Sequence, residues 1–180
     1  MVIPKKIDTP LGDRVTPELK KLRQNAIPAA LAKVERYRLL TQPRLAESIC
    51  LDILQIDEKN QEANRLLILV ITDQFGLNSS GLAKRAREIA AQLESEYDRS
   101  YYAGIIAERL GKAALDSQTP GSNHDAYEWF HEAMEYYDRA ENLQPEGNDD
   151  AILRWNTCAR QIENYRLTER PEEKFHPLLE

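Results

Sequence analysis

One segment of the 180-residue sequence carries potential metal ligands at regular intervals. His124, Glu128, His131 and Glu135 are separated by four, three and four residues, which puts all four side chains on one face of a helix. Imidazole and carboxylate groups gathered in this way are ligands of zinc and related metals. The pattern raises the hypothesis of a metal-dependent enzyme on an α-helical scaffold.

The apolar residues of the same segment weaken that hypothesis. They form a second stripe at helical spacing, expected to be the packed face: Ala126, Phe130, Ala133, Tyr137 and Ala140. His131 and Glu135 fall off this stripe, so we expect them to face water. The sequence HEAME departs from the HExxH metalloprotease pattern, and no second helix offers matching ligands. We therefore expect no metal, and keep the face of His124, Glu128 and His131 as a less favoured enzymatic alternative.

No other segment carries a catalytic motif. A phosphate-binding loop, a dinucleotide fingerprint and a nucleophile elbow are all absent, and GKAAL lacks the upstream glycine of a P-loop. We therefore predict no catalytic residue and no cofactor, and expect that the protein is not an enzyme.

Composition narrows the class of protein. Hydrophobic residues make up 42% and charged residues 30%, with only 7 glycines, which favours a globular helical domain. The net charge of -6 argues against nucleic-acid binding. The longest apolar run, LLILVI at 66–71, is too short to span a bilayer, and the first residues lack the apolar core of a signal peptide. With two cysteines, Cys50 and Cys158, expected to be reduced, we predict a cytoplasmic, bacterial protein that does not bind membranes.

Prolines, glycines and apolar periodicity divide the chain into three parts. Residues 1–26 are expected to be an N-terminal arm with a short helix beginning at Thr16-Pro17, and 168–180 a C-terminal tail. The middle part, 27–167, is predicted to be all-α, with seven to eight helices in the whole chain and no strand. The main expected helices cover about 28–40, 43–56, 63–75, 81–95, 98–116, 122–143 and 148–165. Short turns between them favour antiparallel neighbours.

Two of the expected helices share a spacing of small and bulky residues. The positions, at intervals of four, three and five, are Ala133, Tyr137, Ala140 and Pro145 in one helix and Ala46, Cys50, Ile53 and Glu58 in the other. Small residues allow two helices of a hairpin to cross closely, and the bulky one fills the layer between them. Gly104 lies in an expected first helix of a further hairpin, where it would also permit close packing.

At these positions the sequence resembles the tetratricopeptide repeat (TPR) family, over about residues 27–165. It departs in Glu58, which replaces the usual proline, in the uneven spacing of the units and in the longer loop at 117–124. The resemblance implies about three helical hairpins and a terminal capping helix, in a right-handed superhelical stack of antiparallel hairpins, a TPR-like α-solenoid. An irregular α-helical bundle is the alternative.

The resemblance also implies a binding surface, because the first helices of such hairpins line a concave groove. The positions expected in this groove are Glu35, Arg38, Arg65, Asp73, Tyr101, Glu108, Arg109, Asn156 and Arg160. The arginines offer bidentate hydrogen bonds to carboxylates, while the acids beside them would repel a uniformly acidic ligand. The lysine and asparagine set with which some family members clamp a terminal carboxylate is missing.

These expectations define the predicted function. We predict a non-catalytic interaction module that binds a protein partner, as a peptide or a helix, in the concave groove. A secretion-chaperone-like client binder is an alternative of similar size and acidity. A homodimer is a further alternative, because the ends of such a stack are apolar.

Overall fold

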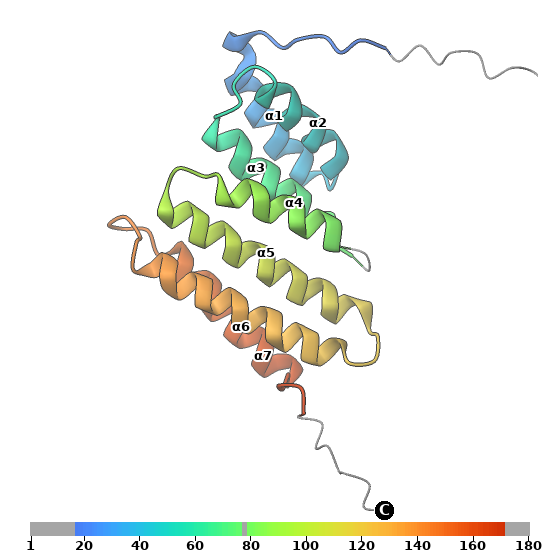
Figure 1. Cartoon of the computed structure of the whole chain (residues 1–180), viewed down its shortest axis with the longest axis vertical. Coiled ribbons are helices and arrows are strands. Elements are labelled where there is room, and N and C mark those ends of the chain that lie inside the picture. The colour runs from blue at the N-terminus through green and yellow to red at the C-terminus, as the bar shows by residue number, and fades with distance from the viewer. Residues whose placement is uncertain (1–16, 77–78, 172–180) are drawn as a thin grey trace, which may run out of the picture.

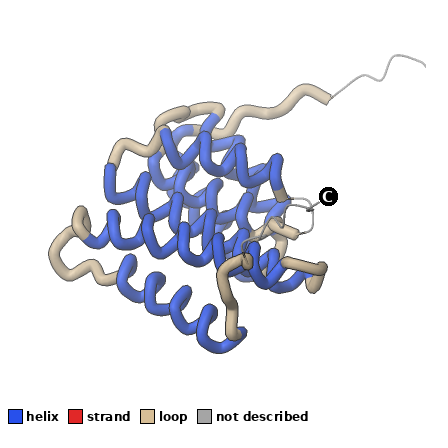
Figure 2. Tube along the Cα trace, turned by 60° about the horizontal axis from the view of Figure 1, so that its bottom comes forward, coloured by secondary structure: helices blue, strands red, loops and turns tan. Residues whose placement is uncertain are grey.

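The structure is a computed structural model that describes residues 17–76 and 79–171. Seven α-helices make up most of this part of the chain, which contains no strand (Figures 1 and 2). They are α1 (Ile27–Leu39), α2 (Pro43–Leu54), α3 (Gln61–Thr72), α4 (Ser80–Ala91), α5 (Glu96–Ser117), α6 (Ser122–Glu141) and α7 (Asp150–Tyr165). The predicted all-α class is therefore confirmed, and seven helices agree with the predicted number.

Local sequence signals explain where several helices begin. Pro28 and Pro43 lie in the first turns of α1 and α2, where a missing backbone N–H leaves no hydrogen bond unmade. Asn60 caps α3 by accepting a hydrogen bond from the backbone N–H of Ala63 at 2.9 Å. Ser95 caps α5 in the same way, through the N–H of Asp98 at 3.2 Å.

The N-terminal arm differs from its prediction. Residues 17–23 are not helical, and a single 3₁₀ turn, Gln24–Ala26, precedes α1. Within 17–23 only Leu22 packs against the core, and Leu19 is exposed. A short helix is unstable in water without such packing, so the Thr-Pro start signal is not sufficient here. Residues 1–16 of the arm and 172–180 of the tail lie outside the described residues.

The helices follow one another along the long axis of the molecule, from α1 and α2 at one end to α6 and α7 at the other (Figure 1). Consecutive helices run antiparallel and pack against each other. Contacts between α1 and α3 and between α3 and α5 join alternate helices as well. The first helices of successive pairs therefore lie side by side, and they present one shared surface.

Two apolar clusters form the core. The cluster of the N-terminal half includes Val34, Ile53 and Ile68, and that of the C-terminal half is built around Phe130 and Tyr137. Leu69 and Tyr102 pack against both clusters and connect them. The molecule therefore has a continuous core along its length.

Glycines allow α5 and α6 to approach closely. A Cβ atom on Gly104 would lie 2.6 Å from Cε1 of Tyr137, and one on Gly111 would lie 3.0 Å from Cε1 of Phe130. The two glycines and the two aromatic residues are each seven positions apart, so the antiparallel helices match them pairwise. The expectation that Gly104 permits close packing is confirmed.

We expect Gly104→Ala to lower the free energy of unfolding measured by urea denaturation. Overpacking a buried contact costs about 1–3 kcal/mol, and this loss should exceed the helix-propensity gain of roughly 1 kcal/mol, because the Tyr137 ring is fully buried. Gly81→Ala in α4 is the matched control, since a Cβ atom there meets nothing within 4 Å. Equal stabilisation of both variants would contradict the close approach.

Candidate functional site

The histidines and glutamates with metal-like spacing do not form a metal site. Glu128, His131 and Glu135 are exposed on α6, and His131 packs its ring on Tyr127 with 4.3 Å between ring centroids. Nδ1 of His124 lies 2.9 Å from the backbone oxygen of Thr168. Within residues 17–76 and 79–171, no three His, Cys, Asp or Glu side chains are grouped so that they could hold one metal ion.

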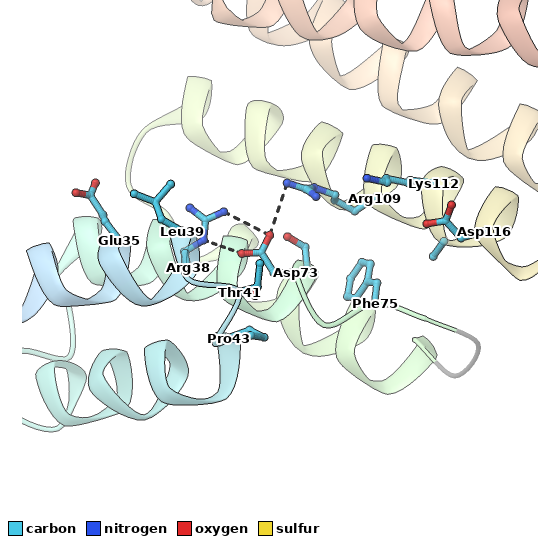
Figure 3. A pocket seen from close by; sticks show the side chains of 12 residues that line it. Glu35, Arg38, Leu39, Thr41, Pro43, Asp73, Phe75, Arg109, Lys112 and Asp116 are labelled. Atoms are coloured by element: carbon cyan, nitrogen blue, oxygen red, sulfur yellow. Dashed lines mark hydrogen bonds and ion pairs between the residues drawn. The ribbon is translucent and has the colours of Figure 1, made fainter.

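The shared surface of the first helices contains two adjoining pockets. The first has a volume of about 700 Å³ and is lined by α1, the end of α3 and α5 (Figure 3). The second, of about 400 Å³, lies between α5, α6 and α7. Arg109, Lys112 and Asp116 of α5 line both pockets. Together the two pockets form a candidate binding groove across the C-terminal half of α5.

Asp73 is the centre of the first pocket. It accepts hydrogen bonds from Nε and Nη2 of Arg38, at 2.8 and 3.4 Å, and forms an ion pair with Nη2 of Arg109 at 3.6 Å. The two guanidinium groups approach the carboxylate from different helices (Figure 3). Because all three side chains are partly buried, solvent screens the interaction less than at an exposed ion pair. Asp73 therefore holds α1, α3 and α5 together.

Glu108 has the same role near the second pocket. It accepts a hydrogen bond from the hydroxyl of Tyr137 at 2.7 Å and one from Nη1 of Arg154 at 3.0 Å, so it joins α5, α6 and α7. Burial raises the pKa of the Tyr137 phenol, and the neighbouring Glu108 charge raises it further. Burial lowers the pKa of Arg154, but the charge of Glu108 outweighs it and the pKa is raised. The phenol and the guanidinium both keep their protons.

Tyrosines of α5 form an aromatic cluster beside this group. Tyr101 stacks on Tyr97 with 5.5 Å between ring centroids, meets Tyr102 edge to face at 5.4 Å, and lies 5.9 Å from the Tyr137 ring. Burial raises the pKa of Tyr101 and raises that of Tyr102 to about 12. Tyr101 therefore packs among other rings and is not part of the lining of either pocket.

The structure brings five of the nine predicted groove residues into the two pockets. These are Glu35, Arg38, Asp73, Glu108 and Arg109. The other four line neither pocket: Arg65 pairs with Asp98 at 3.0 Å, Tyr101 joins the aromatic cluster, Asn156 is half-buried and Arg160 is exposed.

Three charged lining residues were missed by the sequence prediction: Lys112, Asp116 and Arg154. Lys112 follows Arg109 by three residues, so helical spacing was a usable signal for it. Asp116 follows Lys112 by one turn in the same way. Arg154 binds a carboxylate 46 residues away, and no local pattern indicates that pairing.

Comparison of the chain with protein-family models, with curated proteins and with solved structures found no match. Among the described helices, none combines the length and the apolar character that crossing a membrane requires. The helices and the two pockets define an all-α protein with a charged groove formed by successive helices.

We expect Tyr137→Phe to lower the free energy of unfolding by about 1.5–3 kcal/mol, the contribution of a hydrogen bond to a charged group. The phenylalanine ring fills the same space, so the loss isolates the bond to Glu108. Tyr136→Phe is the matched control on the same helix, where the ring lies beside Arg139, and it should change stability by less than about 0.5 kcal/mol. Chemical denaturation measures both variants, and similar values for the two would contradict a stabilising role of the hydroxyl.

Alkaline pH should destabilise the fold. Burial raises the pKa of Tyr137, and brings the pKa of Tyr102, Cys50 and Cys158 to about 12. These pKa values exceed those of the unfolded chain, so the stability is fully present below the unfolded pKa values and is lost as the pH rises above them. Urea denaturation should show a falling free energy of unfolding, by roughly 1.4 kcal/mol per pH unit for each such group, from about pH 9 for the cysteines and about pH 10 for the tyrosines up to about pH 12. Two results together would contradict the burial of these groups. The free energy of unfolding would not change with pH over this range, and the tyrosinate absorbance would appear while the protein is still folded.

Proposed function

We propose that the protein is a non-catalytic interaction module, a TPR-like stack of helical hairpins that binds a peptide or partner helix in the groove on α1, α3, α5 and α7. The observation that carries this proposal is the pair of adjoining pockets on these first helices, which share Arg109, Lys112 and Asp116. Two adjoining pockets that are open to solvent suit an extended ligand better than a small enclosed substrate.

Three hairpins and a capping helix account for the helix order. In this proposal α1–α2, α3–α4 and α5–α6 are the hairpins, α7 covers the last layer, and the stack is a right-handed superhelix. The packing of α1 on α3 and of α3 on α5 supports it, as does the contact of Gly104 with Tyr137. A glycine in the first helix and an aromatic residue in the second are both features of the repeat pattern.

Apolar surface at the rim of the first pocket supplies a source of binding free energy. Leu39 is 85% exposed there, and Pro43 and Phe75 lie in the same lining (Figure 3). Burial of such surface by a ligand is favourable in water. The neighbouring carboxylate of Asp73 is occupied by arginines of the protein itself. Apolar contact at Leu39 is therefore the first feature to test.

Affinity capture from a lysate of the source organism, with wild type, Leu39→Asp and Leu51→Asp compared, tests this proposal. Leu51 is an exposed leucine of α2 that lines neither pocket, so it is a matched control for loss of an exposed leucine. A partner retained by wild type and Leu51→Asp, and reduced roughly tenfold or more by Leu39→Asp, is the expected result.

Surface leucine substitutions are preferable to charge reversal of Arg65 or Arg109. Reversing Arg65 or Arg109 would place a new acid beside Asp98 or Asp73 and destabilise the fold.

A partner captured equally by wild type, Leu39→Asp and Leu51→Asp would have its binding site elsewhere on the protein. The absence of any captured partner would count against the interaction module, and co-purification of one aggregation-prone client would favour the chaperone-like alternative.

A further inference from the structure

Arg109 differs from the other paired arginines of the groove side in its hydrogen bonding. Arg38, Arg65 and Arg154 each donate a hydrogen bond to a carboxylate, at 2.8, 3.0 and 3.0 Å. Nη2 of Arg109 is 3.6 Å from Oδ1 of Asp73, which is an ion pair without a hydrogen bond. Nε of Arg109 is buried, and no acceptor among the described residues reaches it.

Within the described residues, no acceptor forms a hydrogen bond with these donors. Both oxygens of Asp73 already accept hydrogen bonds from Arg38, at 2.8 and 3.4 Å. A buried donor without an acceptor is unfavourable, so buried polar groups in proteins are almost always paired, with protein, water or ligand. Nε is too buried for a ligand to reach, but the Arg109 side chain is 28% exposed, and its Nη groups are the donors that an oxygen atom of a ligand in the groove would meet.

The local charge favours an anionic oxygen. Two guanidinium groups, of Arg38 and Arg109, share the single carboxylate of Asp73, which leaves this centre positive. Lys112 lies one turn further along α5, is exposed, and forms no ion pair within the described part of the chain. The acids Glu35 and Asp116 are also in the lining, and solvent screens them as it screens Lys112, because all three are exposed. The favourable charge therefore comes mainly from the two partly buried arginines around Asp73.

We infer that Arg109 and Lys112 together receive a carboxylate of the ligand at the place where the two pockets meet. The partner is then a peptide segment in which an aspartate or glutamate lies next to a bulky apolar residue. The apolar residue packs against Leu39 or Phe75, which line the first pocket on opposite sides of Asp73 (Figure 3). This inference rests on the proposed function, because it assumes that the groove binds a peptide.

The test uses two acetylated and amidated synthetic peptides, one with a glutamate between two leucines and one with glutamine in its place. Each is titrated at millimolar concentration into the full-length protein, and binding is followed by NMR chemical shifts. Wild type should bind the glutamate peptide roughly tenfold more tightly than the glutamine peptide, and Arg109→Gln should remove this preference. Arg109→Lys should restore part of it, because the charge is kept.

Arg65→Gln is the matched control. It removes an arginine that pairs with a carboxylate on the same side of the molecule but lines neither pocket, so it should leave the glutamate preference unchanged. The urea midpoint of each variant is measured first, so that loss of preference is not confused with unfolding. A preference that disappears only with Arg109 would show direct recognition of the carboxylate.

Two results would overturn the inference. Equal affinity of wild type for both peptides would show that Arg109 does not select a carboxylate. If Leu39→Asp then lowered the affinity for both peptides, the proposed peptide groove would still be supported. No shift of the signals of the groove with either peptide would overturn carboxylate recognition as well. If the preference is seen but Leu39→Asp changes neither affinity, the carboxylate site stands and the apolar part of the proposed groove fails.

Discussion

The fully buried phenol of Tyr137 is the constraint on which the C-terminal half depends. Its ring fills the space that Gly104 leaves between α5 and α6, and its hydroxyl needs an acceptor once water is excluded. Glu108 supplies that acceptor, and Arg154 of α7 compensates the carboxylate charge. The buried hydroxyl is thus linked through Glu108 to all three helices of this half, α5, α6 and α7. It also accounts for a glutamate that is only 13% exposed beside the apolar core.

The same type of interaction repeats along the molecule. Asp73 joins α1, α3 and α5 through Arg38 and Arg109, and a glutamate of α2, Glu47, binds Gln74 at 2.8 Å and Arg85 of α4. Burial raises the pKa of Glu47, but the hydrogen bonds from Gln74 and Arg85 outweigh it and the pKa is lowered. A partly buried acid on one helix thus binds side chains of the neighbouring helices at three places in the molecule, Asp73, Glu47 and Glu108. Charges committed in this way are less available to a ligand, so the proposed recognition depends on the apolar rim residues and on Arg109.

Local signals in the sequence predicted most of the helices because each signal acts within one or two turns. Proline at the first turn, the Asn60 cap and apolar residues at helical spacing act over such distances. The failure at Pro17 follows from the same physics, because a start signal without an apolar face to bury does not stabilise a helix. Five predicted groove residues line the pockets, whereas Arg65 and Tyr101 are engaged in contacts with Asp98 and with neighbouring rings.

The sequence by itself determined the all-α class, the approximate helix boundaries and the glycine that permits close packing, since these depend on neighbours along the chain. It also supplied the arginines and carboxylates of the groove. Only the tertiary structure decided which of them pair, because the partners are 33 to 46 residues apart and meet through the packing of whole helices. Only the tertiary structure shows that donors of Arg109 have no acceptor within hydrogen-bonding distance among the described residues. The lack of an acceptor results from the positions of α1, α3 and α5 relative to one another, which place Asp73 within hydrogen-bonding distance of Arg38 and slightly too far from Arg109.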